Sequence, residues 1–209
     1  MKLLALADIH AEEQVIKRIG RWKAGKDYDY AVVCGDLTNN GPPDFAEEFF
    51  ETAENCLFVP GNNDPPAILE IAKRHNALLH NKEMKIKGLS FVGFGYSSPT
   101  PYNTVGELSE EEIYRQMKNL PISEESILVL HSPPFGVLDE VDDIHAGSRS
   151  VRKIIDLRKP SLALFGHVHE IEGKKKVGET LCVNLPPAMK LRCAIIDVGS
   201  KIEVKFRKL

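Results

Sequence analysis

The sequence predicts an α/β protein in which two packed β-sheets are flanked by helices. In the first third of the chain, short apolar runs alternate with stretches of helical periodicity, the order expected for parallel strands joined by crossover helices. In the remainder, apolar runs of strand length outnumber the helical stretches and are too many for one open sheet. Two sheets packed together, with the helices outside, accommodate both observations.

The length and composition are those of one globular domain. The chain has 209 residues, of which 43% are hydrophobic and 27% charged, the proportions of an ordinary soluble protein. A chain of this length can bury about 70% of its surface, which allows a substantial core. Because the sequence has no internal repeat and no long linker, we expect residues 1–209 to form a single domain.

The first third of the chain is predicted to contain three strands, each followed by a helix. Buried strands are expected at 3–7, 30–34 and 57–59. Apolar residues at helical spacing mark the helices: Val15, Ile16 and Ile19 in the first, Phe45, Phe49 and Phe50 in the second, and Ile68, Leu69 and Ile71 in the third. Prolines open the second and third helices.

The rest of the chain is predicted to be richer in strands. Lys87-Gly88 suits a hairpin turn, and Ser109 with Glu112 forms a capping box for a helix to about Asn119. Val151, Ile154, Ile155 and Leu157 mark a helix that Pro160 ends. Strands are expected at 84–86, 89–94, 127–130, 162–165, 181–183, 194–198 and 202–206, with a loop over 132–147, lysines 174–176 at a solvated hairpin tip, and His75 and His80 exposed.

Cysteine usage, charge and the N-terminus favour a cytoplasmic protein. The four cysteines have no CxxC spacing and are expected to be buried, reduced thiols. The apolar run that begins at Met1 stops at Asp8, short of a secretory signal, and no segment approaches the ~20 apolar residues of a membrane span. The net charge of −3 gives no general electrostatic attraction to nucleic acid or an anionic membrane.

Residues able to bind metal recur directly after the predicted buried strands. They are Asp8 and His10 after the first strand, Asp36 after the second, Asn62 and Asp64 after the third, His131 after the 127–130 strand, and His167 and His169 after the 162–165 strand. Parallel α/β sheets bind ligands beyond the carboxyl ends of their strands, so these segments should meet in one crevice. Turn chemistry explains Gly, Asn and Asp at such places, but not the histidines.

In this order the motifs resemble those of the calcineurin-like metallophosphoesterase superfamily. They are DxH at Asp8–His10, GD at Gly35-Asp36, GNxD at Gly61–Asp64, the lone His131 and GHxH at Gly166–His169. The resemblance spans residues 8–169 and is closest to small, stand-alone members without a large cap domain. It implies a four-layer αββα sandwich, with two mixed β-sheets flanked by helices, and a dinuclear metal centre.

The resemblance also implies a ligand set. One metal is expected to take Asp8, His10, Asp36 and His169, and the other Asp36, Asn62, His131 and His167. Asp36 bridges, because a carboxylate has two oxygens and can offset the charge of two cations ~3.5–4 Å apart. Imidazole, carboxylate and amide ligands suit two Mn²⁺ ions, with Fe or Zn²⁺ as alternatives, better than Ca²⁺.

The implied activity is that of a hydrolase acting on phosphate esters, with phosphodiesters favoured over monoesters. Two cations lower the pKa of a shared water, and the metal-activated hydroxide attacks phosphorus in line with the leaving oxygen. The expected partner is a small phosphoester substrate, rather than nucleic acid or a membrane. The oligomeric state is left open.

The sequence departs from the family pattern at Asn63, where many relatives have a histidine that contacts the phosphate and helps protonate the leaving group. An asparagine amide can donate a hydrogen bond but cannot act as a general acid. Asn63 is therefore either a phosphate contact or a simple turn residue. His145, in the predicted 132–147 loop, is the candidate replacement acid, and Asn184 near the last core strands is a candidate orienting residue.

Two other functions use the same fold. The retromer scaffold subunit resembles this family but binds proteins with a compromised metal site, and Asn63 keeps a catalytically weak scaffold as an alternative. Double-strand-break repair nucleases share these motifs as well. The net charge of −3 and the absence of a DNA-binding domain argue against a nuclease.

Overall fold

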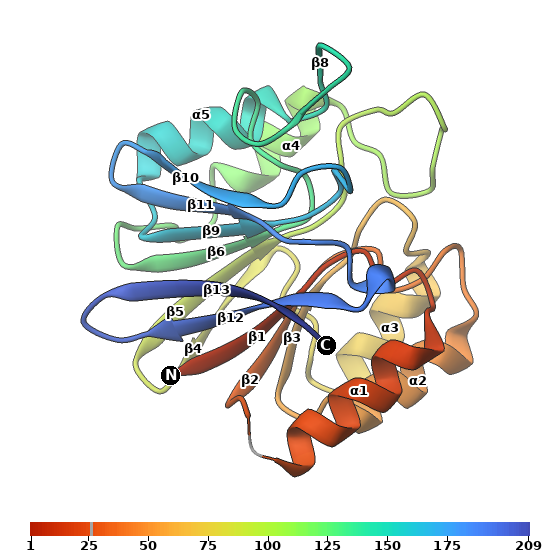
Figure 1. Ribbon diagram of the computed structural model, residues 1–209. Helices are drawn as coiled ribbons and strands as arrows, with labels where there is room; N and C mark the ends of the chain where they lie inside the picture. Colours follow the sequence, from red (N-terminus) through yellow and green to blue (C-terminus); the bar gives the residue numbers. More distant parts are fainter. Residues whose placement is uncertain (26) are drawn as a thin grey trace.

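The computed structural model describes residues 1–25 and 27–209, which form two large mixed β-sheets packed face to face (Figure 1). The first sheet has the order β13 (Ile202–Lys208), β12 (Arg192–Val198), β1 (Lys2–Leu6), β2 (Tyr30–Cys34) and β3 (Cys56–Val59). The second has the order β10 (Gly173–Val177), β11 (Thr180–Asn184), β9 (Leu162–Phe165), β6 (Ser126–Leu130), β5 (Leu89–Phe94) and β4 (Lys82–Ile86).

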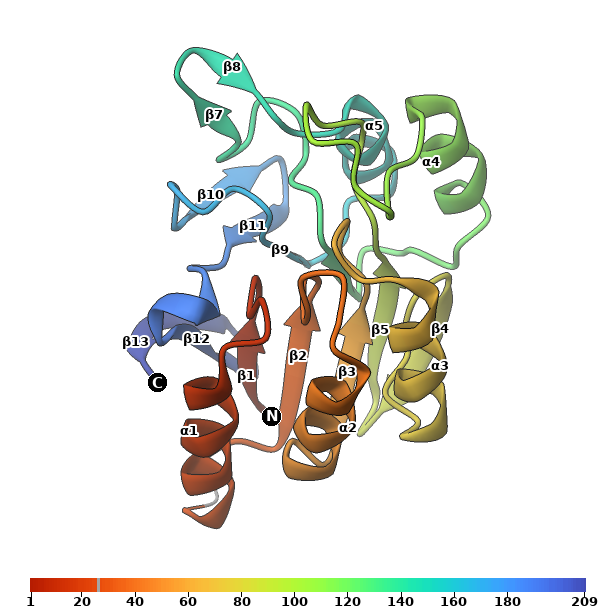
Figure 2. The same ribbon diagram turned by 90° about the vertical axis from the view of Figure 1, so that its right-hand side faces the viewer.

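Helices cover the outer face of each sheet, so the molecule has four layers (Figures 1 and 2). Against the first sheet lie α1 (Glu13–Ala24), α2 (Pro43–Thr52) and α3 (Pro66–Arg74). Against the second lie α4 (Glu110–Met117) and α5 (Arg149–Arg158). The αββα sandwich predicted from the sequence is therefore confirmed.

The side-chain alternation of β1 shows how one strand serves two layers. Leu4 and Leu6 point to the helix-covered face and pack in the same cluster as Val15 and Phe49. Leu3 and Ala5 point between the sheets, into the cluster that includes Phe91 from the second sheet. Successive strand residues face opposite sides, so a strand buried on both faces is apolar throughout. That is why these strands appear in the sequence as short continuous apolar runs.

The directions of the strands put their carboxyl ends at one edge of the sandwich. β1 pairs in parallel with β2, and β2 with β3, as the strand–helix alternation predicts. In the second sheet β5, β6 and β9 are also parallel. The loops after β1, β2 and β3 leave from the same edge of the first sheet, the edge that faces the loops of the second sheet (Figure 2).

Some local expectations are wrong. The predicted loop over 132–147 contains a short hairpin, β7 (Glu140–Val141) and β8 (Ile144–His145). Lysines 174–176 lie on the edge strand β10, not at the hairpin tip that follows it. Leu157 is on the exposed side of α5, with 61% of its surface accessible. His75 and His80 are both half-buried: the His75 ring stacks on Phe50, and the His80 ring packs against Phe94 and Tyr96.

The capping box of α4 is confirmed, since Ser109 and Glu112 exchange hydrogen bonds at the helix start. The four cysteines are free and buried, as predicted. Within the described ranges, no helix has the length and apolar character needed to cross a bilayer.

Candidate metal centre

All seven side chains predicted to bind metal meet at the carboxyl edge of the two sheets. They come from the loops after β1 (Asp8 and His10), β2 (Asp36), β3 (Asn62), β6 (His131) and β9 (His167 and His169). Their nitrogen and oxygen atoms form one continuous network of short contacts. Each sheet contributes part of the network, so the site exists only when the two sheets are packed together.

One half of the network is centred on His10. Its Nε2 atom is 3.4 Å from Nε2 of His169 and 3.6 Å from Oδ2 of Asp36. Nε2 of His169 is in turn 3.3 Å from Oδ1 of Asp8. Asp8, His10 and His169 offer ligand atoms that all lie within 4.8 Å of one another. These are the four side chains predicted for one of the two metals.

The other half is centred on His131, which is fully buried. Its Nε2 atom is 2.8 Å from Oδ1 of Asn62, 3.1 Å from Nδ1 of His167 and 3.7 Å from Oδ1 of Asp36. Asp8, Asp36 and His131 also form a group within 4.8 Å, so Asp8 lies between the two halves. The division of the ligands between two ions stays a prediction.

The contact between His131 and Asn62 brings together two acceptor atoms that a cation would bind. Nδ1 of His131 lies 2.9 Å from the carbonyl oxygen of Cys34, which can only accept, so Nδ1 carries the proton. In the neutral ring Nε2 then carries no proton, and its lone pair faces the Asn62 carbonyl oxygen, with the two atoms 2.8 Å apart. Two acceptors at this distance repel each other unless a cation lies beside them. The donor set therefore fits a divalent metal of the transition series.

Two residues that sequence reasoning missed fix the orientation of Asn62. Its Nδ2 donates to the hydroxyl of Thr104 at 3.0 Å, and that hydroxyl donates to Oε1 of Glu107 at 2.7 Å. Because the Thr104 proton is committed to Glu107, Thr104 can only accept from Asn62. The Asn62 carbonyl oxygen must therefore face His131. Burial raises the pKa of Glu107, but hydrogen bonds from Thr100 and Thr104 outweigh it and hold the pKa at about 2.

The backbone is strained where it presents ligands. Asp8, His10, Asp36 and His167 all have positive φ angles, between 48° and 72°. Non-glycine residues seldom adopt this conformation, and it concentrates at functional sites. Gly61 is required for a different reason: a Cβ atom there would overlap the Asp36 carboxylate.

Burial favours the neutral form of two histidines of the network, His10 and His167. Burial lowers the pKa of His10 despite the nearby charges of Asp36 and Asp8. Burial, assisted by His131, lowers the pKa of His167 to about 4. His169 differs, because its hydrogen bond with Asp8 raises its pKa. Burial would raise the pKa of Asp8, but His169 and the other histidines outweigh it and lower the pKa.

The GNxD motif supports Asp36 from two sides. The backbone N–H and the Nδ2 group of Asn63 donate to the two carboxylate oxygens of Asp36, at 2.8 and 2.7 Å. Asp64 is buried and accepts from the backbone of Leu37, Thr38 and Gly61, which holds the loop after β2 in place. Burial and the charge of Asp36 raise the pKa of Asp64 to about 6. A contact between Asn63 and a phosphate stays a prediction.

His145 lies on β8 and lines the same cavity as the metal-binding side chains. Its Nδ1 is 3.0 Å from Oδ1 of Asp139, a buried carboxylate that also accepts from the backbone of Gly136 and Gly147. The Phe135 ring packs against the imidazole, with centroids 4.7 Å apart. Asp139 was not singled out from the sequence, since nothing local distinguishes it from other loop carboxylates.

Asn184 is buried and connects two of these loops. Its Nδ2 donates to the carbonyl oxygens of Leu138, at 3.0 Å, and Val168, at 3.4 Å. The asparagine thus ties the segment before His145 to the segment between His167 and His169.

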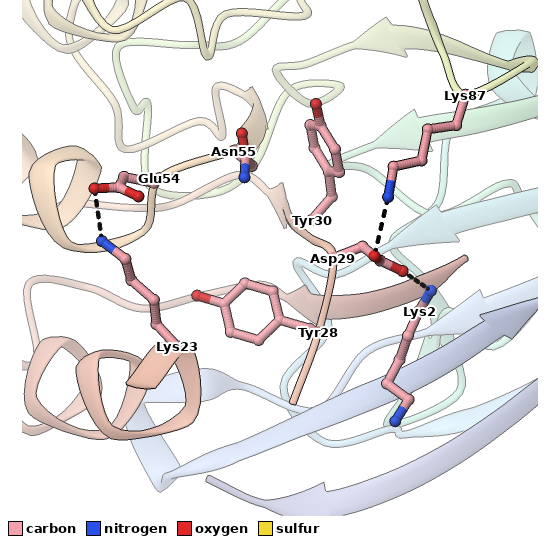
Figure 3. A pocket seen from close by; sticks show the side chains of 8 residues that line it. All are labelled: Lys2, Lys23, Tyr28, Asp29, Tyr30, Glu54, Asn55 and Lys87. Carbon is pink, nitrogen blue, oxygen red and sulfur yellow. Dashed lines mark hydrogen bonds and ion pairs between the residues drawn. The ribbon is translucent and has the colours of Figure 1, made fainter. Parts of the chain in front are cut away.

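A cavity of about 620 Å³ opens over the metal-binding side chains. His10, Asp36, Asn62, His167 and His169 form its floor, and the 99–102 segment and the β7–β8 hairpin form its walls. A second cavity, of about 670 Å³, lies at the opposite ends of β1, β2 and β3 (Figure 3). There Lys23 pairs with Glu54 and Lys87 with Asp29, so both carboxylates of this cavity are already paired with lysines.

Comparison with known proteins agrees with this geometry. The family model for calcineurin-like phosphoesterases matches residues 1–170. "Uncharacterized protein MJ1162" of Methanocaldococcus jannaschii is 36% identical over 198 residues, which are 90% of this chain and 88% of that protein. The chain therefore belongs to the calcineurin-like phosphoesterase family.

Two solved structures share the fold at low sequence identity. A dimetal phosphatase from Danio rerio superposes with a TM-score of 0.68 and 13% identity, over 100% of this chain and 96% of that one. A structure described as a novel archaeal phosphodiesterase has a TM-score of 0.60 and 16% identity, over 100% of both chains. At these identities the likeness establishes the fold alone.

Proposed function

We propose that this protein hydrolyses phosphodiesters, with two Mn²⁺ ions at the centre formed by Asp8, His10, Asp36, Asn62, His131, His167 and His169. The observation that carries the proposal is the pair of acceptors at His131 and Asn62, which a cation would satisfy; His131 is buried, and Asn62 lines the open cavity. The phosphodiesterase and phosphatase activities named for the two structural neighbours support the same reaction class.

The charge of the cavity favours diesters over monoesters. Of the described residues that line it, none is Lys or Arg, whereas Asp142 and Glu170 are on its rim. A phosphomonoester carries up to two negative charges near neutral pH, and a phosphodiester carries one. With no basic side chain to offset the second charge, the acidic rim repels a monoester more strongly than a diester.

The metal ions, when bound, supply a nucleophile from water at neutral pH and offset negative charge on the phosphoryl oxygens. The side chains of the chain itself do the positioning. Asn63 holds both oxygens of Asp36, and Glu107 and Thr104 hold the Asn62 carbonyl toward His131. Such supporting hydrogen bonds keep ligands at their productive geometry and are commonly worth about 10–100-fold in metal affinity or activity.

His145 is the group that protonates the leaving oxygen. Asp139 accepts a hydrogen bond from Nδ1–H of His145 and so fixes the tautomer and the ring orientation. The Nε2 atom of the protonated ring then carries the proton that passes to the departing alkoxide. This assigns to a β7–β8 hairpin residue the role that Asn63 cannot perform.

The first test is turnover of bis(4-nitrophenyl) phosphate and 4-nitrophenyl phosphate by the Mn²⁺-reconstituted protein. We expect metal-dependent cleavage of the diester at a higher kcat/KM than the monoester. Equal or better cleavage of the monoester would contradict the diester preference. Loss of turnover with every divalent metal tested would leave the scaffold function as the better hypothesis.

The His145 assignment makes a prediction about leaving groups. His145→Ala should slow a diester with an alkyl alcohol leaving group by about 10²–10⁴-fold, the usual worth of a general acid. The same variant should slow bis(4-nitrophenyl) phosphate far less, because nitrophenolate leaves without protonation. His75→Ala is the matched control, since His75 pairs with Glu47 away from the cavity. Equal slowing of both substrates by His145→Ala would exclude His145 as the acid.

A further inference from the structure

Two apolar lips flank the cavity above the metal-binding side chains. One is the segment 99–102, with Pro99, Pro101 and Tyr102, and the other is the β7–β8 hairpin, with Val141 and Ile144. The two come from distant parts of the sequence, yet both project from the same side of the second sheet (Figure 2). They are part of the same cavity as His10, Asp36 and His169.

These lips hold an unusual share of exposed apolar surface. Tyr102 is 83% exposed and Ile144 is 69% exposed, although both are large apolar side chains. The other large hydrophobic side chains with such exposure in the described ranges are Val105 and Leu157. Single exposed apolar residues are ordinary, but two that line one cavity beside a polar centre indicate a binding surface.

Hydrogen bonds hold both lips in place without covering them. In the first, Glu107 accepts from the hydroxyls of Thr100 and Thr104, and the Tyr102 backbone donates to Thr100. In the second, the buried Asp139 accepts from the backbone N–H groups of Gly136 and Gly147 at the base of the hairpin. The apolar side chains are thus presented by ordered loops, which lowers the entropy cost of binding to them.

We infer that the lips form a subsite for an aromatic or extended apolar ester arm of the phosphodiester substrate. The inference rests on the proposed function, because the phosphate of the same molecule occupies the metal-binding floor. Continuity of the cavity places the arm beside the phosphate. Charge supports the choice of arm, since Asp142 and Glu170 on the rim repel an anionic arm while Tyr102 and Ile144 gain from covering an apolar one.

The subsite is tested with two ligands that differ only in the arm. These are the monomethyl esters of methylphosphonate and phenylphosphonate, each with one negative charge and no nitrophenyl group. Their affinities for the Mn²⁺-loaded protein are measured by calorimetry. We expect the phenyl compound to bind at least about tenfold more tightly, a modest fraction of what burial of an aromatic ring contributes.

Substitutions assign the preference to the lips. Tyr102→Ala should reduce the ratio of the two affinities below about threefold, Ile144→Ser should reduce it as well, and Tyr102→Phe should retain it, because the ring and not the hydroxyl makes the contact. Val105→Ala is the matched control, since Val105 is an exposed apolar residue three positions after Tyr102 that does not line the cavity. It should leave the ratio unchanged.

The outcomes separate the subsite from the proposed function. Equal affinities for the two ligands, in a protein that cleaves bis(4-nitrophenyl) phosphate, would overturn the subsite alone. An unchanged ratio in Tyr102→Ala and Ile144→Ser would overturn its location. Absence of metal-dependent diester turnover would overturn the proposed function, and the subsite with it.

Discussion

The two cavities at opposite ends of the same strands are nearly equal in volume, about 670 Å³ at the amino ends and about 620 Å³ at the carboxyl ends of β1, β2 and β3. At the amino ends both carboxylates are paired with lysines. Asp29 accepts from the Lys2 backbone and from Lys87, and Glu54 pairs with Lys23 (Figure 3). At the carboxyl ends, the Nε2 lone pair of neutral His131 faces the carbonyl oxygen of Asn62, so two hydrogen-bond acceptors lie together. Volume alone therefore does not identify a functional site, whereas unmatched ligand atoms do.

Backbone strain has different causes at the two ends. Asn55 and Lys87 beside the amino-end cavity also have positive φ angles. Lys87 belongs to a two-residue hairpin turn with Gly88, where such angles are required, and asparagine tolerates them in turns. At the carboxyl ends the strained residues are among those predicted to bind metal, Asp8, His10, Asp36 and His167. Positive φ indicates a functional site only where turn chemistry does not account for it.

A pair of matched aspartate variants gives the largest contrast between the two ends. Asp36→Asn removes a charge from the centre of the metal-binding network and should lower diester turnover by about 10³-fold or more, beyond the roughly 10²–10³-fold cost of losing one transition-state donor. Asp29→Asn makes the same chemical change in the other cavity and should alter kcat/KM less than about twofold. Similar losses in both variants would show that the comparison of the two cavities is wrong.

Removal of metal should lower the stability of the protein, and this effect should depend on the carboxyl-end cavity and not on the amino-end cavity. A ligand at about 100 times its Kd stabilises a protein by about 2.7 kcal/mol, which is roughly 5–10 °C in Tm for a chain of this size. We expect chelation to lower the Tm of the Mn²⁺-loaded protein by this amount. The shift should persist in Asp29→Asn and disappear in Asp36→Asn. Calorimetric scans of the loaded and chelated forms measure it.

The hydrogen bond that orients Asn62 can be removed without substituting any residue predicted to bind metal. Thr104→Val removes the hydroxyl that accepts from Asn62, so the amide is free to rotate, and metal affinity should fall by about 10–100-fold. Thr180→Val is the control, because the Thr180 hydroxyl is buried without a partner among the described residues. Metal titrations of the two variants would contradict the proposed support if they gave the same affinity.

The smallest effect is the contribution of His80 to the pH dependence of stability. Burial lowers the pKa of His80 to about 4, whereas the unfolded chain titrates near 6.5. Between these values the unfolded state binds more protons, so the free energy of unfolding falls as pH falls from about 6.5 to 4. From pH 7 to pH 5 we expect a loss of about 1–2 kcal/mol.

In chemical denaturation of the metal-free protein, His80→Gln should reduce this slope by the His80 contribution and leave that of His167, whose pKa burial also lowers to about 4. Asp29→Asn should retain it, because hydrogen bonds from Lys2 and Lys87 lower the pKa of Asp29 and put its titration at more acid pH. A slope that is unchanged in His80→Gln would assign the acid sensitivity to other groups.

Much of the fold was predictable from the sequence because the patterns that indicate its helices and turns are local. Prolines at helix starts, the capping box at Ser109 and the Lys87-Gly88 turn all correspond to structure at the predicted places. The short hairpin within 132–147 was missed, since two-residue strands leave no periodic pattern. His80 was misassigned because its burial depends on Phe94 and Tyr96, which reach it only in the folded chain.

The convergence of the seven side chains predicted to bind metal was predictable from the sequence, because each follows a buried strand and parallel topology brings strand ends together, whereas metal binding itself stays a prediction. Only the tertiary structure identified the residues that support them. Thr104, Glu107 and Asp139 lie in loops. Thr104, held by Glu107, contacts Asn62, and Asp139 contacts His145; how those loops cross the sheet edge determines these contacts. The same holds for the apolar lips at Tyr102 and Ile144. Strand ends are placed by regular hydrogen-bonded geometry, whereas loop side chains are placed by contacts between segments that are distant in sequence.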